Sequence, residues 1–136
     1  MKNRLLLIIG LIYASFLFSQ NVTQISTTGI KNSKVFEQTL SNGIEQKYII
    51  EETNYDAEGR IIERKVFSRK GNIKQWEKYK FDAFGNLTEE LSLDHLGAII
   101  KKEITIFKDQ RRLSKEYYDA KNRLYKKKSY EYTYGK

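Results

Sequence analysis

The segment Phe81-Asp82-Ala83-Phe84-Gly85-Asn86-Leu87 decides the fold, because its pattern recurs along the chain. An aromatic residue or Leu comes first and Asp usually follows. Gly usually stands fifth, before a polar residue and a final Ile or Leu. Six such segments begin at residues 55, 67, 81, 93, 107 and 118. Tyr55, Phe81 and Phe107 are spaced by 26 residues, so the chain is a tandem repeat with a double unit.

Each copy of the segment has the composition of a tight turn. An Asp in second place can accept hydrogen bonds from backbone amides two residues on, and a Gly in fifth place suits the left-handed backbone of a bulged hairpin. Arg111 stands at the Gly position of the fifth copy, which predicts a strained turn or one of another type. The predicted turn residues are Asp56, Gly59, Gly71, Asp82, Gly85, Asp94, Gly97, Asp119 and Asn122.

The stretches between these turns alternate in polarity with a period of two, as in 87–93 and 100–106. This alternation is typical of half-buried strands, and no stretch after residue 20 keeps a helical period. The sequence therefore predicts an all-β fold, an antiparallel meander of about eight strands built from tandem β-hairpins. We expect a curled open sheet, with 35–40 and 46–53 as two further strands upstream of the repeats.

The N-terminus has the layout of a secretory signal peptide. Lys2 and Arg4 precede an uncharged, mostly apolar run over 5–18, and Ser19 and Gln20 follow it. A membrane-spanning helix needs roughly 20 apolar residues, so an uncleaved anchor is the alternative rather than the first expectation. We predict a signal peptide over 1–19, a polar lead-in with one strand over 20–43, and the repeat domain over 44–136. The protein is then exported to the periplasm, the outer surface or the medium, and spans no membrane once the signal is cleaved.

Composition excludes several kinds of chemistry. The 136 residues fit one domain, and the absence of Cys excludes disulfides, thiolate zinc sites and thiol nucleophiles. The single His95 lies in a predicted turn, and no Gly-x-Ser-x-Gly occurs. Glu89 and Glu103 could approach across strands, although neighbouring lysines make ion pairing the simpler interpretation. We expect no metal, no cofactor and no enzyme; an enzyme acting on envelope glycans would need convergent carboxylates.

The segments at 55–61, 81–87 and 118–124 resemble the YD repeat, also called the RHS repeat. The resemblance covers residues 44–134 and implies β-hairpin repeats that extend into a long curled sheet. Large members of that family wrap the sheet around a toxin domain or form cell-surface spirals, and some are linked to carbohydrate binding. Three to four hairpin pairs cannot enclose a cargo, so the resemblance implies only the fold and a binding role. The composition is similar to that of small exported proteins of Bacteroidota-type bacteria.

Aromatic and basic side chains are the candidates for binding. Tyr and Trp combine an apolar body with a polar tip, which suits stacking on sugar rings. Basic clusters in the C-terminal half would attract an anionic partner. The structural alternatives are cross-strand packing for the aromatic rings and Lys-protected sheet edges for the charges. The predicted binding residues are Trp76, Tyr130, Tyr132 and Tyr134, with Lys126 and Lys128 on the Tyr130 face.

These observations favour an exported non-catalytic repeat protein that serves as a binding or scaffolding module of the cell envelope, with glycans as one class of ligand. The alternative is an immunity or inhibitor protein that docks a toxin or enzyme through its sheet. The expected partners are a polysaccharide or a protein. A second copy of the chain is a further option, because an open sheet has free edges. Export argues against nucleic acid.

Overall fold

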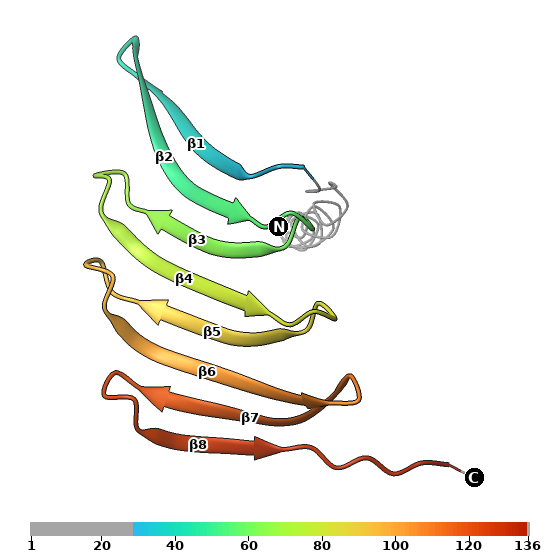
Figure 1. Cartoon of the computed structure of the whole chain (residues 1–136). Coiled ribbons are helices and arrows are strands. Elements are labelled where there is room, and N and C mark those ends of the chain that lie inside the picture. The colour runs from blue at the N-terminus through green and yellow to red at the C-terminus, as the bar shows by residue number, and fades with distance from the viewer. Residues whose placement is uncertain (1–28, 136) are drawn as a thin grey trace, which may run out of the picture.

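The computed structural model describes residues 29–135, which form one antiparallel sheet (Figure 1). Each strand pairs with the next one in sequence, so the predicted meander is confirmed and the sheet stays open. The segments predicted as strands over 35–40 and 46–53 lie in the first two strands. The signal peptide predicted over 1–19 lies outside the described residues. The strands are β1 (Asn32–Ser41), β2 (Ile44–Tyr55), β3 (Ile61–Phe67), β4 (Ile73–Phe81), β5 (Leu87–Leu93), β6 (Ile99–Lys108), β7 (Arg111–Asp119) and β8 (Leu124–Ser129).

Asp side chains hold the repeated turns together as the sequence predicts. Asp82 Oδ1 accepts hydrogen bonds from the backbone amides of Phe84 and Asn86, each at 2.9 Å. The same two bonds recur at Asp56, Asp94 and Asp119. The fifth residue of each of these turns, and of the turn that begins with Phe67, has a positive φ. These residues are Gly59, Gly71, Gly85, Gly97 and Asn122.

The polar residue after the glycine closes the turn from its other side. Asp82 Oδ2 accepts a hydrogen bond from Asn86 Nδ2 at 2.9 Å. In the first and sixth copies, Arg60 and Arg123 donate from Nε to the corresponding Asp oxygen, at 2.6 and 2.8 Å. The Arg or Asn of the motif is therefore explained by its bond to the turn carboxylate. Ala98 has no side-chain donor for this bond.

The fifth turn is of another type, as the Arg at its Gly position predicts. Lys108 pairs directly with Arg111, which leaves a two-residue loop. Asp109 and Gln110 in that loop have φ values of 51° and 61°. Positive φ at both central residues is the mark of a type I′ hairpin. Asn42-Gly43, between β1 and β2, repeats the same arrangement with φ values of 51° and 76°.

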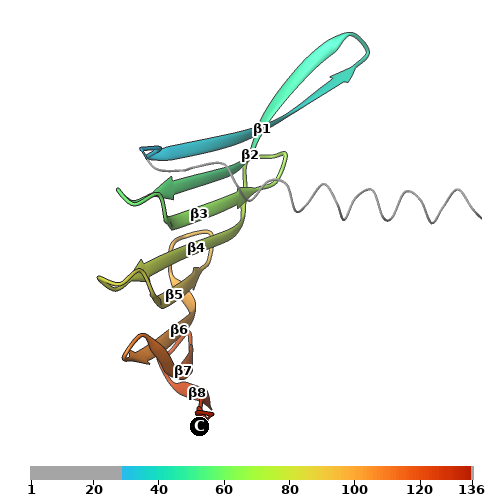
Figure 2. The same cartoon turned by 90° about the vertical axis from the view of Figure 1, so that its right-hand side faces the viewer.

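A one-residue shift of register next to each of the six repeated turns curls the sheet. Tyr55 pairs with Ile61 and Phe81 pairs with Leu87, so the first and last motif residues face each other across the hairpin. The preceding pair in each hairpin is displaced by one residue, which is the signature of a β-bulge. Bulges bend the strand and increase its twist. Their repetition accounts for the curved strands in Figures 1 and 2.

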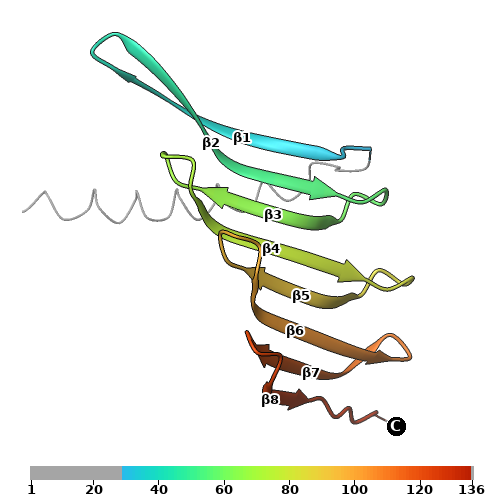
Figure 3. The same cartoon turned by 60° about the vertical axis from the view of Figure 1, so that its left-hand side comes forward.

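Opposed residues share a face of the sheet, and this defines two faces. We call one the Trp76 face; a direct row across it contains Glu63, Lys78, Leu91, Lys102 and Tyr118. We call the other the Tyr117 face; a direct row across it contains Tyr79, Glu90, Glu103, Tyr117 and Lys126. Both faces meet solvent, because the described chain forms one layer (Figures 2 and 3).

The sheet has almost no apolar core. Within residues 29–135, Leu93 is the one buried apolar side chain, at 9% exposure. The other buried residues are small and polar, namely Thr53, Thr105 and Ser114. Small side chains in a single layer are covered by longer side chains on neighbouring strands. Side chains are therefore buried by their neighbours on the same face of the sheet rather than between two packed layers.

The β1–β2 hairpin extends beyond the rest of the sheet. β3 pairs with β2 only from Glu51 onward, so residues 36–49 form a projecting two-stranded ribbon that we call the arm (Figures 1 and 3). Its apolar side chains lie open, with Leu40 76% and Ile44 63% exposed. An ion pair between Arg69 and Glu37 ties the arm to the β3–β4 turn.

We predict that Gly85→Ala lowers the free energy of unfolding by about 1 kcal/mol, because an L-residue is strained at φ 84°. A Cβ there would lie 3.6 Å from Arg60 Nη1, an ordinary contact, so strain alone carries the effect. The reciprocal variant Asn122→Gly should stay within about 0.5 kcal/mol of the wild type. Urea unfolding followed by circular dichroism measures both. Equal stability of Gly85→Ala and wild type would contradict the assigned turn.

Candidate functional site

The structure brings together three of the predicted binding residues. Lys126 and Lys128 lie on β8 and project from the Tyr117 face. Tyr130 follows the end of β8, and its amide donates to the carbonyl oxygen of Leu113 at 3.1 Å. These side chains come from consecutive even positions, so the alternation seen in the sequence carries into the structure.

Trp76 stands apart from that group, on the opposite face and on β4. The ring lies under Lys65 and Lys78, whose Nζ atoms are 4.3 and 5.5 Å from its centroid. Its Nε1 donates to Glu63 Oε1 at 2.7 Å. A Cβ on Gly97 would come within 3.2 Å of the ring. Trp76 is thus packed into its own face and does not join a platform with the C-terminal tyrosines.

Four lysines surround the ring of Tyr117. Their Nζ atoms lie 5.1–5.9 Å from its centroid, within the usual range of cation–π contacts. The ring centroids of Tyr125 and Tyr117 are 6.3 Å apart, and the two ring planes are inclined by 51°. Tyr125 is 57% exposed. We call this group the basic cluster; it contains Tyr117, Tyr125, Lys101, Lys115, Lys126 and Lys128.

Carboxylates neutralise one side of the basic cluster only. Lys115 Nζ lies 2.9 Å from Glu90 and 2.5 Å from Glu103, and Lys101 also pairs with Glu103. Lys126 and Lys128 form no ion pair with a carboxylate of the described chain. Lys128 also stands directly opposite Lys115, a like-charge pair that costs stability. The cluster therefore presents two uncompensated cations beside an exposed ring.

The predicted approach of Glu89 to Glu103 is wrong. Glu89 pairs with Ile104 on the Trp76 face, where Lys80 Nζ lies 2.7 Å from its carboxylate. The bulge next to the β5–β6 turn changes the register that simple counting predicts. Glu90 is the residue that faces Glu103 directly.

The electrostatics of Glu103 favour an ion pair over acid catalysis. Burial by itself would raise the pKa of this carboxyl, but hydrogen bonds from Lys101 and Lys115 outweigh burial and bring the pKa below its ordinary value. A general acid needs a raised pKa. Burial would lower the pKa of Lys115, but its contacts with Glu103 and Glu90 outweigh burial and raise that pKa. Glu90 and Glu103 therefore act as counterions of the lysines.

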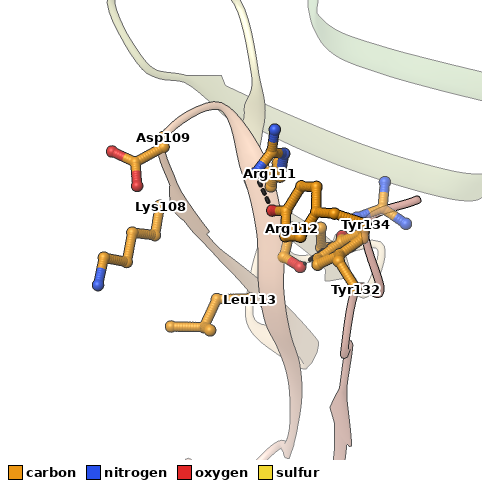
Figure 4. Close-up of a pocket in the computed structure, with 7 residues that line it drawn as sticks. All are labelled: Lys108, Asp109, Arg111, Arg112, Leu113, Tyr132 and Tyr134. Atoms are coloured by element: carbon orange, nitrogen blue, oxygen red, sulfur yellow. Dashed lines mark hydrogen bonds between the residues drawn. The ribbon is translucent and has the colours of Figure 1, made fainter. Parts of the chain in front are cut away.

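The segment after β8 forms a cavity against the β6–β7 turn (Figure 4). Tyr132 donates its hydroxyl to the carbonyl oxygen of Arg112 at 2.7 Å. The Arg111 guanidinium lies 4.7 Å from the Tyr134 ring centroid and donates to the Tyr134 hydroxyl. We call this space of about 200 Å³ the tail cavity; it is lined by Lys108, Asp109, Arg111, Arg112, Leu113, Tyr132 and Tyr134.

The tail cavity contains Arg111 and Arg112, a basic pair of the C-terminal half that sequence reasoning did not place among the predicted binding residues. Lys108, Arg111 and Arg112 make no ion pair with any carboxylate between residues 29 and 135. Arg112 instead lies over the ring of Tyr130, 5.4 Å from its centroid. The available signal was the charge count: over residues 101–136, twelve Lys and Arg against five Asp and Glu supply +7 of the chain's +8.

Other candidate sites give little chemistry. His95 is exposed in its turn and lines a shallow recess with Gly71, Asn72 and Ile73. Over the described residues, no three His, Asp or Glu side chains gather as a metal site would require. Helices long and apolar enough to cross a membrane are likewise absent from residues 29–135. No model of a known protein family matches the chain, and comparison with curated proteins finds no match.

We predict that stability falls as the pH drops below about 4.5, the ordinary pKa of Glu, and continues to fall through the lower pKa of folded Glu103. A depressed carboxyl pKa contributes stability above the unfolded value, and protonation removes that contribution. Urea unfolding midpoints at pH 7, 5, 4 and 3 measure this loss of stability. Glu103→Gln should be less stable at pH 7 and less sensitive to acid. Glu45→Gln at an exposed position is the control. If Glu45→Gln reduced the acid sensitivity of stability as much as Glu103→Gln, the role assigned to Glu103 would be refuted.

Proposed function

We propose that this protein is an exported, non-catalytic binding module of the cell envelope, built from YD-like hairpin repeats, that takes a polysaccharide on its Tyr117 face. The observation that carries the proposal is the basic cluster. Tyr117 is surrounded by four lysines, and two of them, Lys126 and Lys128, have no carboxylate partner in the described chain. Cationic side chains left uncompensated beside exposed aromatic rings are a surface suited to an anionic chain.

The geometry of β8 suits an extended ligand. Lys126 and Lys128 are two residues apart on one strand, which spaces their Cα atoms by roughly 7 Å along the strand. Tyr125 precedes them with its ring exposed, and Tyr130 follows them. A sugar chain laid along β8 would meet rings and cations in succession. Tyr rings offer an apolar surface to the C–H groups of sugars and a hydroxyl for hydrogen bonds.

Two features support an envelope location. The leader-like segment 1–19 would direct export, and the chain has no Cys that an oxidising compartment could cross-link. A single-layer sheet with both faces in solvent is also more useful for contact than for enclosing a reaction.

We predict that the protein retains acidic envelope polysaccharide in a pull-down at physiological salt, and that Lys126→Gln/Lys128→Gln weakens retention about tenfold. The matched control is Lys102→Gln/Lys127→Gln, which removes the same charge from the Trp76 face. If both double variants lost retention equally, the binding would depend on net charge alone and not on the Tyr117 face. Complete loss of wild-type retention on adding salt would do the same.

The arm favours a second candidate, an immunity or inhibitor protein that docks a toxin or enzyme. Leu40 and Ile44 stand open near the tip of a projecting hairpin, where they cannot contribute to burial within the sheet. Exposed apolar side chains on a projecting element are typical of protein–protein contacts.

If this second function holds, the chain should co-purify with the product of a neighbouring toxin or enzyme gene. Leu40→Ser/Ile44→Ser should then weaken the complex at least tenfold, because central apolar contacts dominate such interfaces. Thr39→Ala/Gln46→Ala in the same arm is the control, and circular dichroism checks that the fold persists. A complex unaffected by the Leu40/Ile44 change would exclude the arm as the docking site.

A further inference from the structure

We infer that the polysaccharide carries uronic-acid carboxylates and that Arg111 binds one of them in the tail cavity. This inference rests on the proposed function and specifies its ligand. The tail cavity adds to the basic cluster what a flat surface lacks, namely a concave site with guanidinium groups in its lining (Figure 4).

The charges of the tail cavity point to an anionic group. Lys108, Arg111 and Arg112 line it against a single carboxylate, that of Asp109. None of the three cations is paired with a carboxylate in the described part of the chain. The guanidinium group is planar and donates two parallel hydrogen bonds to a carboxylate, a geometry that an ammonium group cannot reproduce. The guanidinium of Arg111, which lies at the Tyr134 ring in the cavity wall, is therefore a better match for a carboxylate than for a neutral sugar.

The size and walls of the cavity point to a single sugar unit. Its volume of about 200 Å³ lies below the ~300 Å³ at which pockets for drug-sized ligands begin. Tyr132 and Tyr134 form part of the wall and remain 48% and 65% exposed. Their rings can contact the apolar face of a pyranose while Arg111 binds its carboxylate. Hydrogen bonds to Arg112 and Arg111 fix both tyrosines in place.

The cavity continues into the basic cluster. Arg112 lies 5.4 Å from the Tyr130 ring centroid, and Lys128 and Lys126 follow on the same face of β8. A polyuronate seated in the cavity and laid along β8 would meet an ammonium group for a second carboxylate. Repeated carboxylates along the ligand match repeated cations along the strand. Guanidinium groups also bind phosphates in a bidentate way, so a nucleic acid is the comparison ligand that the test must include.

The test uses the exported form of the protein and measures its binding to polygalacturonate oligosaccharides by calorimetry at physiological salt. We expect methyl esterification, which removes the charge and leaves the sugar rings, to weaken binding at least tenfold. Arg111→Lys/Arg112→Lys keeps the charge but loses the planar donors, and it should weaken binding several-fold. A matched single-stranded oligonucleotide and dextran sulfate are the other ligands.

Equal affinity for the ester, the oligonucleotide or dextran sulfate would overturn the assignment to uronic acid. An unchanged affinity of Arg111→Lys/Arg112→Lys would overturn the role of the cavity. If that variant binds normally while Lys126→Gln/Lys128→Gln does not, the proposed function stands and this inference fails. If the protein bound no polysaccharide at all, both the proposed function and this inference would be refuted. Circular dichroism spectra that match the wild type show that the variants are folded, so a loss of binding is not caused by misfolding.

Discussion

The sheet has a single layer, so each side chain must find its partners on its own face. On the Trp76 face, Lys80, Glu89, Ile104, Glu116 and Lys127 form one direct row across β4 to β8, in which acids stand beside bases. Thr53 is only 2% exposed although no second layer covers it. Long Lys, Glu and Tyr side chains cover their shorter neighbours with their apolar stems. A composition that is 31% charged is therefore what this architecture requires.

The 26-residue period follows from the way hairpins alternate. Successive turns fall at opposite ends of the sheet, so only every second turn shares an end (Figure 1). The first motif residue also changes face each time: Tyr55, Phe81 and Phe107 project from the Tyr117 face, and Phe67, Leu93 and Tyr118 from the Trp76 face. Two hairpins are thus the smallest unit that repeats in both position and orientation. Contacts between turns reflect this, since Arg60 lies 4.8 Å from the Phe81 ring centroid.

The sequence reveals this fold because its turns carry their own chemistry. Asp82, Gly85 and Asn86 each have a local reason for their place, and each reason can be read from seven residues. The bulges cannot be predicted in this way, because no particular amino acid marks the extra residue of a bulge. Counting without them placed Glu89 opposite Glu103. The tail cavity escaped for a different reason, since it depends on how a segment without strand pairing folds back onto Arg111 and Arg112.

Strands pair only with their sequence neighbours, and this has a consequence for how the molecule folds. Backbone contacts between strands lie within single hairpins, so the conformational entropy lost before the first contacts form is small. Any hairpin can serve as a nucleus from which the next strand is added, as in other quasi-one-dimensional repeat proteins. Duplication of a hairpin pair would lengthen the sheet without repacking what already exists. Chain length in this architecture is thus open to evolutionary change in steps of one double unit.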